Sequence, residues 1–375
     1  MPINHKTLLT LGLLLLCLTL TFSQAQLAST EEEFQIGLVL PLTGSLEAVG
    51  NAVKNASELA LAEINQTASI QLRFVVEDSA STAEGAVTAF NNLIEQGVTA
   101  IIGPVTSSAS EQTFPIAQEN GVLTLSPLAA AGGLSEIGDY VFQANLTTDV
   151  VIPNGVALTQ ASLGYENVAI LLDTDDLFSQ NAYEVLLASF EAQGINVVAT
   201  ETLQTDDTDF SAQLGRIQNA EPDAIFISTL PLEGVGILQQ AKELGLSDES
   251  RFIIPFAFST DEIALAQDAA EGVITFSTWT SFAPNPGNEA FVDAYSTTYG
   301  TEPSRFLAQG YASVYIFAQA LENAASTDAA DLRDALADIQ NLDTILGQFS
   351  FDETGKAIYN PIMLVVNGAQ FEVFE

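Results

Sequence analysis

Residues 100–111 read AIIGPVTSSASE, a stretch that contains a short apolar strand, a sharp turn and the start of a helix. The small and branched residues at 100–102 are typical of a strand covered on both faces, and the Gly-Pro that follows ends it. Ser108 and Glu111 have the spacing of a capping box, so we expect a helix to begin there. A strand that leads directly into a helix is the repeating unit of a parallel α/β sheet.

The same strand–helix unit recurs on both sides of this stretch. Candidate strands are Phe34–Leu40, Ile70–Val76, Ala100–Ile102, Val122–Leu125, Val168–Leu172, Val197–Thr200, Ala224–Ser228, Phe252–Pro255 and Val273–Phe276. Between them lie amphipathic helical patterns, among them 86–94, ended by Gly97, and 183–190, ended by Gly194. The alternation runs twice, which predicts an α/β protein with two doubly wound parallel-sheet lobes.

The chain also offers a way of joining the two lobes. A polar junction at 145–149 separates the two sets of strands, and helical patterns at 289–340 precede strand-like segments near the end. We assign residues 33–147 and 280–345 to the first lobe, and 148–279 and 346–375 to the second. Such a path predicts a multi-strand hinge about which the lobes can close.

The first 25 residues have the order of an export signal. A polar start is followed by an apolar run at 8–22 and by small residues at 23–25. We predict cleavage after Ala25 and a secreted, periplasmic or otherwise extracytoplasmic protein. A lipid anchor at Cys17 is the alternative, but the bulky Leu16 precedes it where lipidation requires a small side chain. The apolar run is also shorter than the ~20 residues of a membrane-spanning helix.

The composition excludes most catalytic chemistry. His5 and Cys17 are the only histidine and cysteine, and both lie in the predicted signal. The remaining chain therefore has no imidazole or thiolate for a nucleophilic relay or for zinc. The GVG at 234–236 lacks the third glycine of a dinucleotide loop, and Gly355-Lys is followed by Ala357, unlike a phosphate-binding loop. A pair of carboxylates as in glycosidases stays the alternative, since acids are plentiful, but nothing singles out such a pair. We predict a protein that is not an enzyme and that has no cofactor.

Two acidic clusters, at 173–176 and 206–209, are the candidates for a metal site. Calcium binds several carboxylate oxygens, but neither cluster has the glycine and the distal glutamate of an EF-hand loop. A strand-end loop explains the first cluster, and a helix N-cap explains the second. We favour these interpretations and predict no metal.

Charge excludes a further class of partner. The chain has 48 acidic and 9 basic residues, a formal net charge of −39, which rules out nucleic acid on electrostatic grounds. The acids are scattered along the chain, as expected for a solvated surface. Because a secreted protein meets the salt of its surroundings directly, our hypothesis for this bias is a saline habitat.

Loops at the carboxyl ends of the predicted strands form a candidate binding site. Thr106, Ser107 and the free N–H groups of the following helix would hold an anionic group at a sheet edge. In the second lobe Phe178, Leu230 and Phe256 each follow a strand and would supply an apolar wall across a cleft. An ordinary N-cap and ordinary core packing remain the alternatives for these residues.

Several short motifs carry a family resemblance. They are IGLVLPLTG at 36–44 with Gly50, the run 60–65, Glu77-Asp78, IGP at 102–104 with 106–108, LSP at 125–127, Asp209-Phe210, QAKELG at 240–245, and FSFD at 349–352 with Gly355. In order and spacing the chain resembles the leucine/isoleucine/valine-binding family of ABC-importer solute-binding proteins, with the type I periplasmic-binding fold. The resemblance implies a hinged trap, a small-molecule ligand and a membrane permease as partner, and we expect a monomer.

The resemblance also implies roles for individual residues. In amino-acid-binding members a serine at the position of Ser107 holds the α-carboxylate, and an aromatic residue at the position of Phe178 lines the ligand. A threonine usually stands at the position of Ala130 and, with the carbonyl at Leu128, holds the α-ammonium. A tyrosine and an acidic residue often lie near the positions of Leu230 and Ala257, which here are apolar.

These departures bear on the ligand, because a buried ammonium without its partners costs several kcal/mol. We therefore expect an anionic or uncharged ligand with an apolar or aromatic body, such as a small carboxylic acid, ahead of a branched-chain amino acid. The predicted ligand-binding residues are Val49, Thr106, Ser107, Leu128, Ala129, Ala130, Phe178, Leu230, Phe256 and Ala257. A ligand-sensing receptor module is the alternative function; it predicts an attached membrane segment or signalling partner, and this chain ends at Glu375.

Overall fold

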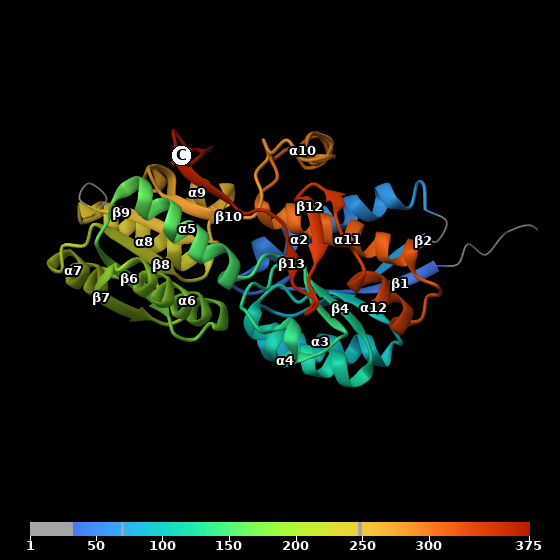
Figure 1. Ribbon diagram of the computed structural model, residues 1–375. Helices are drawn as coiled ribbons and strands as arrows, with labels where there is room; N and C mark the ends of the chain where they lie inside the picture. Colours follow the sequence, from blue (N-terminus) through green and yellow to red (C-terminus); the bar gives the residue numbers. More distant parts are fainter. Residues whose placement is uncertain (1–32, 69–70, 247–249) are drawn as a thin grey trace, which may run out of the picture.

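The computed structural model describes residues 33–68, 71–246 and 250–375, which form two α/β lobes side by side (Figure 1). The predicted export signal, with its cleavage site after Ala25 and with Cys17, lies outside the described residues. Among the helices of the described part of the chain, none is long and apolar enough to cross a membrane.

The first lobe is built on a five-stranded parallel sheet in the order β2-β1-β3-β4-β5. Its elements are β1 (Glu33–Leu40), α2 (Glu47–Ile64), β2 (Gln71–Asp78), α3 (Ala83–Glu95), β3 (Ala100–Ile102), α4 (Ser107–Asn120), β4 (Leu123–Ser126), the 3-10 turn η1 (Ser135–Ile137) and β5 (Val141–Gln143). The sequence pattern did not predict β5, which has only three residues.

The second lobe is built on a seven-stranded sheet in the order β15-β14-β10-β9-β8-β6-β7. Its elements are α5 (Thr148–Leu163), β6 (Asn167–Asp173), α6 (Leu177–Gln193), β7 (Asn196–Leu203), α7 (Ser211–Asn219), β8 (Ala224–Ser228), α8 (Pro231–Glu243), β9 (Arg251–Pro255), α9 (Thr260–Ala266), η3 (Gln267–Ala270), β10 (Ile274–Ser277), β14 (Ile362–Asn367) and β15 (Gln370–Val373). Strands β6 to β10 are parallel, whereas β14 and β15 pair antiparallel at the edge.

Alternate residues of the central strands enter different cores, which is why these strands are apolar throughout, whereas the edge strands β2 and β7 are partly exposed. In β1 Leu38 packs into the core shared with α2 and α11 (Arg305–Asn323), and its neighbour Val39 packs into the core with α3 and α4. In β6 Ile170 and Leu171 divide in the same way between two cores. Helices therefore cover both faces of both sheets, and the predicted doubly wound lobes are confirmed.

The C-terminal part of the chain completes both lobes. Helix α11 packs along α2 and contacts α12 (Ala329–Ala337). Helix α10 (Asn288–Tyr299) contacts α11 through the rings of Phe291 and Tyr311, whose centroids lie 4.4 Å apart. A small antiparallel sheet of β11 (Leu342–Thr344), β12 (Gly347–Phe351) and β13 (Ala357–Ile358) follows.

This small sheet corrects one part of the predicted lobe boundaries. We assigned residues 346–375 to the second lobe, but Lys356 bridges to Gln143 of β5, and the Phe351 ring lies 5.2 Å from the Phe142 ring. Residues 347–358 therefore lie against the first lobe. The reason is the apolar side of β12, which is buried against the end of the first sheet.

Within the described residues the chain passes three times between the lobes, at 144–147, 278–287 and 359–361. One side chain of α11 connects all three crossings. The Nε2 atom of Gln309 lies 3.1 Å from Oδ1 of Asn145, 3.0 Å from Oγ1 of Thr278 and 2.7 Å from the hydroxyl of Tyr359. One buried side-chain amide thus joins the three crossings of the predicted multi-strand hinge.

Candidate ligand-binding site

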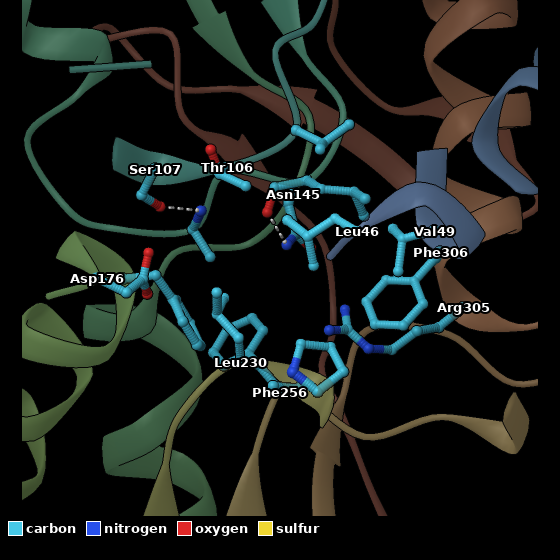
Figure 2. A pocket seen from close by; sticks show the side chains of 16 residues that line it. Leu46, Val49, Thr106, Ser107, Asn145, Asp176, Leu230, Phe256, Arg305 and Phe306 are labelled. Atoms are coloured by element: carbon cyan, nitrogen blue, oxygen red, sulfur yellow. Dashed lines mark hydrogen bonds between the residues drawn. The ribbon is translucent and has the colours of Figure 1, made fainter. Parts of the chain in front are cut away.

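A cavity of about 70 Å³ lies where the two lobes meet (Figure 2). The first lobe contributes Leu46, Val49, Val105, Thr106, Ser107, Leu128, Ala130, Asn145, Arg305 and Phe306, and the second lobe contributes Asp176, Phe178, Leu230, Pro231, Phe256 and Ala257. The walls are mainly apolar, with a few polar groups, which is the usual composition of a small-molecule site.

Strand order explains why the cavity forms at this place. The first sheet has the order 2-1-3-4-5, and β7-β6-β8-β9-β10 repeats it in the second lobe. In such sheets the helices after the first and third strands leave on opposite faces, so a crevice opens at the carboxyl ends of these strands. Most cavity residues follow β1, β3, β4 and β5 in one lobe and β6, β8 and β9 in the other, whereas Arg305 and Phe306 begin α11.

The turn after β3 brings the first helix of the site close to the sheet. Gly103 has a φ of +123°, and a Cβ on it would clash with the backbone of Val39 in β1. Helix α4 begins at Ser107 and is capped by Thr106, whose Oγ1 accepts a hydrogen bond from N–H of Ala109 at 3.3 Å. The predicted start at Ser108 with a capping box is therefore wrong, because the Thr106 hydroxyl satisfies this turn instead.

Ser107 lies at the cavity wall and organises the neighbouring loop. Its Oγ accepts hydrogen bonds from the backbone N–H groups of Ala130 at 3.2 Å and Ala131 at 3.1 Å. Its own hydroxyl proton is left to donate toward a ligand. The arrangement places a hydroxyl donor and the first turn of α4 on one side of the cavity, where an oxygen acceptor would be favoured.

The loop after β4 contributes Leu128 and Ala130 but not the residue between them. Ala129 donates its N–H to Oγ of Ser126 at 3.1 Å, and its side chain packs into the core with α3 and α4. The prediction that Ala129 lines the site is therefore corrected. The Leu128 carbonyl accepts a hydrogen bond at 3.0 Å from Nδ2 of Asn145, so a protein donor already binds the carbonyl expected to hold an ammonium.

Aromatic side chains form the wall of the second lobe. The rings of Phe178 and Phe256 pack edge to face, with centroids 6.0 Å apart. Phe256 has a φ of +69°, a conformation that costs about 1–3 kcal/mol for a residue with a bulky side chain. Its N–H donates to the carbonyl of Phe276 at 3.2 Å, which holds the strained backbone in place. Local strain of this kind is typical of binding and catalytic sites.

Asp176 connects the two lobes beside the cavity. Its Oδ2 accepts from N–H and Oγ of Ser179, both at 2.9 Å, and so caps α6. Its Oδ1 accepts from Oγ of Ser108 in the first lobe at 3.0 Å. Burial raises the pKa of Asp176, and these hydrogen bonds oppose the shift. The 173–176 cluster is therefore the strand-end loop that we favoured, and its last residue also caps α6. The helix N-cap that we favoured for 206–209 is wrong, because the N-cap residue of α7 is Phe210, whose side chain has no hydrogen-bond acceptor.

Arg305 is the cavity residue that sequence reasoning missed. It begins α11 and is only 7% exposed, and its guanidinium extends toward the centre of the cavity, opposite Ser107 (Figure 2). Burial lowers its pKa to about 10, with Glu262 and Tyr359 acting in the other direction, so the group stays charged at neutral pH. The signal in the sequence was a rare base at the start of a long apolar helix.

Nine of the ten predicted site residues line this one cavity, and Ala129 is the exception. That they contact a ligand stays a prediction. Sequence reasoning also missed Leu46, Val105, Asn145, Asp176, Pro231 and Phe306 as lining residues. Among the residues that the structure describes, no three His, Cys, Asp or Glu side chains come together as a metal would require.

Two α/β lobes, a hinge of several crossings and a cavity between the lobes define a binding protein for small solutes. The family model for periplasmic binding proteins matches residues 33–370, and the chain belongs to this family. The family consists of solute-binding proteins that work outside the cytoplasm, and it is not a family of enzymes. The predicted family is confirmed.

Relatives and solved structures agree with this assignment. The leucine-, isoleucine-, valine-, threonine- and alanine-binding protein of Pseudomonas aeruginosa is 27% identical, over 88% of this chain and 89% of its own. A leucine-binding protein from Thermotoga maritima matches with a TM-score of 0.86 and 26% identity, covering 91% of this chain and 98% of that one. A branched-chain amino acid binding protein of Streptococcus pneumoniae, solved with isoleucine, has a TM-score of 0.84, 27% identity and coverage of 91% and 98%.

Proposed function

We propose that the chain is the extracytoplasmic solute-binding protein of an ABC importer. It traps a small carboxylic acid, amide or apolar amino acid between its lobes and delivers it to a membrane permease. One observation carries the proposal: the cavity lined by Ser107 and Phe178 takes its walls from strand ends of both lobes. A ligand there contacts both lobes only when they are closed, so binding stabilises the closed form.

The relatives support the transport role and the size of the ligand. The similar proteins from Thermotoga maritima and Streptococcus pneumoniae bind leucine and isoleucine, and the latter belongs to a branched-chain amino acid transporter. The predicted contacts on the first lobe are Val49, Thr106, Ser107, Leu128 and Ala130. On the second lobe they are Phe178, Leu230, Phe256 and Ala257.

Ligand-induced stabilisation tests the proposal. The protein is screened by thermal shift against carboxylic acids, their amides and apolar amino acids, and mass spectrometry identifies any solute that co-purifies with it. We expect at least one compound to raise Tm and to reduce the radius of gyration in X-ray scattering, because a bound ligand closes the lobes.

A blocked cavity provides the control. Leu230→Trp fills the cavity and should abolish the shift, whereas Leu232→Trp changes a residue that is 50% exposed and outside the cavity, and should retain it. The proposal fails if no compound raises Tm, or if Leu230→Trp responds as the unmodified protein does.

The same proposal includes properties of the mature protein. Export with cleavage after Ala25 predicts an intact mass that begins at Gln26, whereas a lipid at Cys17 would give a larger, acylated mass. A monomer without affinity for nucleic acid is expected from the net charge of −39, and light scattering coupled to gel filtration measures its mass.

A further inference from the structure

Arg305 differs from the other bases of the described chain. Residues 33–68, 71–246 and 250–375 contain eight Lys and Arg. Six of them form ion pairs with Asp or Glu, namely Lys54, Arg73, Arg216, Lys242, Arg333 and Lys356. Of the other two, Arg251 is exposed, and Arg305 is 7% exposed and lines the cavity.

The surroundings of the Arg305 guanidinium are mostly apolar. Its Cζ lies 4.3 Å from the ring centroid of Phe306 and 6.0 Å from that of Phe256, so it contacts aromatic rings from both lobes. Among the described residues, none accepts a hydrogen bond from its Nε or Nη1. Glu262 acts on it electrostatically, but Oε2 of Glu262 accepts from N–H and Oγ of Ser259 and forms no ion pair with Arg305 within the described structure.

A buried cation without a hydrogen-bonded partner is costly, so an anionic group that binds beside it removes part of that cost. The planar guanidinium presents parallel N–H donors that match the two oxygens of a carboxylate. Because the side chain extends into the cavity, that carboxylate would be part of the bound solute (Figure 2).

The cavity offers less to an ammonium group. Asp176 is the carboxylate that lines it, and three of its roughly four acceptor positions already receive hydrogen bonds from Ser108 and Ser179. The Leu128 carbonyl accepts from Asn145, and the Oδ1 of Asn145 accepts from Gln309. A zwitterion would also bring its positive charge into the same small space as Arg305.

We infer that Arg305 pairs with the carboxylate of the solute, and that the solute is a small organic monoanion with an apolar body and no α-ammonium group. This inference rests on the proposed function and names its substrate class. Ser107 lies on the other side of the cavity. It donates its hydroxyl proton to a further oxygen of the solute, where the solute carries one outside its carboxylate.

The net charge of −39 makes a local cation necessary for such a ligand. The negative potential of the whole protein opposes the approach of an anion. A guanidinium inside a closed, water-poor cavity acts at short range, where screening by salt is weak and the attraction is strong.

Matched compounds separate the charge from the shape of the ligand. Calorimetry compares 4-methylpentanoate, 4-methylpentanamide and leucine, and then 3-phenylpropanoate, its amide and phenylalanine. We expect one of the two acids to bind at least about thirtyfold more tightly than its own amide and its own amino acid. Arg305→Gln should reduce this preference of acid over amide by about thirtyfold, and Arg305→Lys should keep part of it.

Arg333→Gln is the control, because this arginine of the same lobe pairs with Asp139 and Asp334 at the surface and should leave the preference unchanged. Tm without ligand shows whether the variants are folded, and Arg305→Gln should raise it because an unpaired buried charge is removed.

The inference is overturned if leucine or phenylalanine binds as tightly as its matched acid. It is also overturned if the acid-to-amide ratio is the same in Arg305→Gln. In both cases the proposed function stands, since a solute is bound. If none of the six compounds binds and no compound of the wider thermal-shift screen raises Tm, the proposed function itself fails.

Discussion

The hydroxyl of Ser108 in the first lobe donates a hydrogen bond to Oδ1 of Asp176 in the second lobe, at 3.0 Å. The same Oγ accepts from the N–H of Leu177 at 3.0 Å, so one side chain of α4 is tied to the first residues of α6. Asn181 of α6 makes a further contact between the lobes and accepts from the N–H of Gly132 at 3.0 Å. Because these contacts cross from one lobe to the other, we expect opening of the lobes to break them, so that they add to the stability of the closed form.

Removing the Ser108 hydroxyl should weaken ligand binding from outside the cavity. Ser108→Ala deletes both contacts to the start of α6, one of them to the cavity residue Asp176, and replaces no residue that lines the cavity, so we expect about a fivefold loss of affinity, equivalent to about 1 kcal/mol. Calorimetry with the solute identified by the screen measures it. Thr113→Ala, which removes a hydroxyl bound to Ala109 within the same helix, should lower Tm and leave the affinity unchanged. Equal affinity of Ser108→Ala and the unmodified protein would contradict this role.

We expect the loss of the Gln309 amide to destabilise the hinge. Gln309→Met removes the contacts to Asn145, Thr278 and Tyr359. The buried Oδ1 of Asn145 then loses its donor, whereas the Tyr359 hydroxyl still accepts from the N–H of Leu146, so the free energy of unfolding should fall by about 2 kcal/mol. Urea unfolding measures the loss, and hydrogen exchange should rise first in the three crossings. Gln319→Met, at a partly exposed position of the same helix, should change neither. Uniform exchange across both lobes would argue against a hinge role.

The buried carboxyl groups are expected to make the stability depend on pH. Burial raises the pKa of Asp173, Asp176, Glu233 and Glu262. The folded state then binds more protons than the unfolded state between the ordinary pKa, about 4, and the raised pKa. Stability from these groups is complete below the ordinary pKa and is lost as pH rises through the raised one. Hydrogen bonds from Asn167 and Glu166 lower the pKa of Asp223, so this group changes the stability only below about pH 4.

We therefore expect a larger free energy of unfolding at about pH 5 than at about pH 7.5, measured with urea at constant ionic strength. Asp176→Asn should make this difference smaller, whereas Asp343→Asn, at an exposed site, should leave it as it is. A stability that rises steadily from pH 5 to neutrality would show that the pKa directions are wrong.

Local sequence patterns predicted the residues of the site that follow a strand. Ser107 and Phe178 could be found because each directly follows an apolar strand, and the carboxyl ends of parallel strands meet at one edge. Ala129 and Ala130 could not be told apart, because the backbone conformation of the loop decides which of two adjacent alanines faces the cavity. Phe256 was found by position, although its positive φ has no signature in the sequence.

Local sequence patterns could not predict that Arg305 lines the cavity. It belongs to a helix far from the strand ends in sequence, and it reaches the cavity because α11 packs along α2. Such a long-range contact is set by tertiary packing and not by periodicity. The lobe boundary near residue 346 failed for a similar reason, since β12 and β13 are short and their partner β5 lies about 200 residues earlier.

Salt is expected to stabilise the protein. With a net charge of −39, repulsion between acidic side chains opposes the compact state, and counterions screen it. The surface ion pairs, such as that of Lys54 with Glu58, weaken in salt as well, but exposed pairs contribute only about 0–1 kcal/mol each. The free energy of unfolding in urea should therefore rise from dilute buffer to about 1 M NaCl, with the steepest rise at low salt, where the Debye length changes most. KCl should act as NaCl does, because screening does not distinguish the two cations. A flat or falling curve in both salts would contradict the hypothesis of adaptation to a saline habitat.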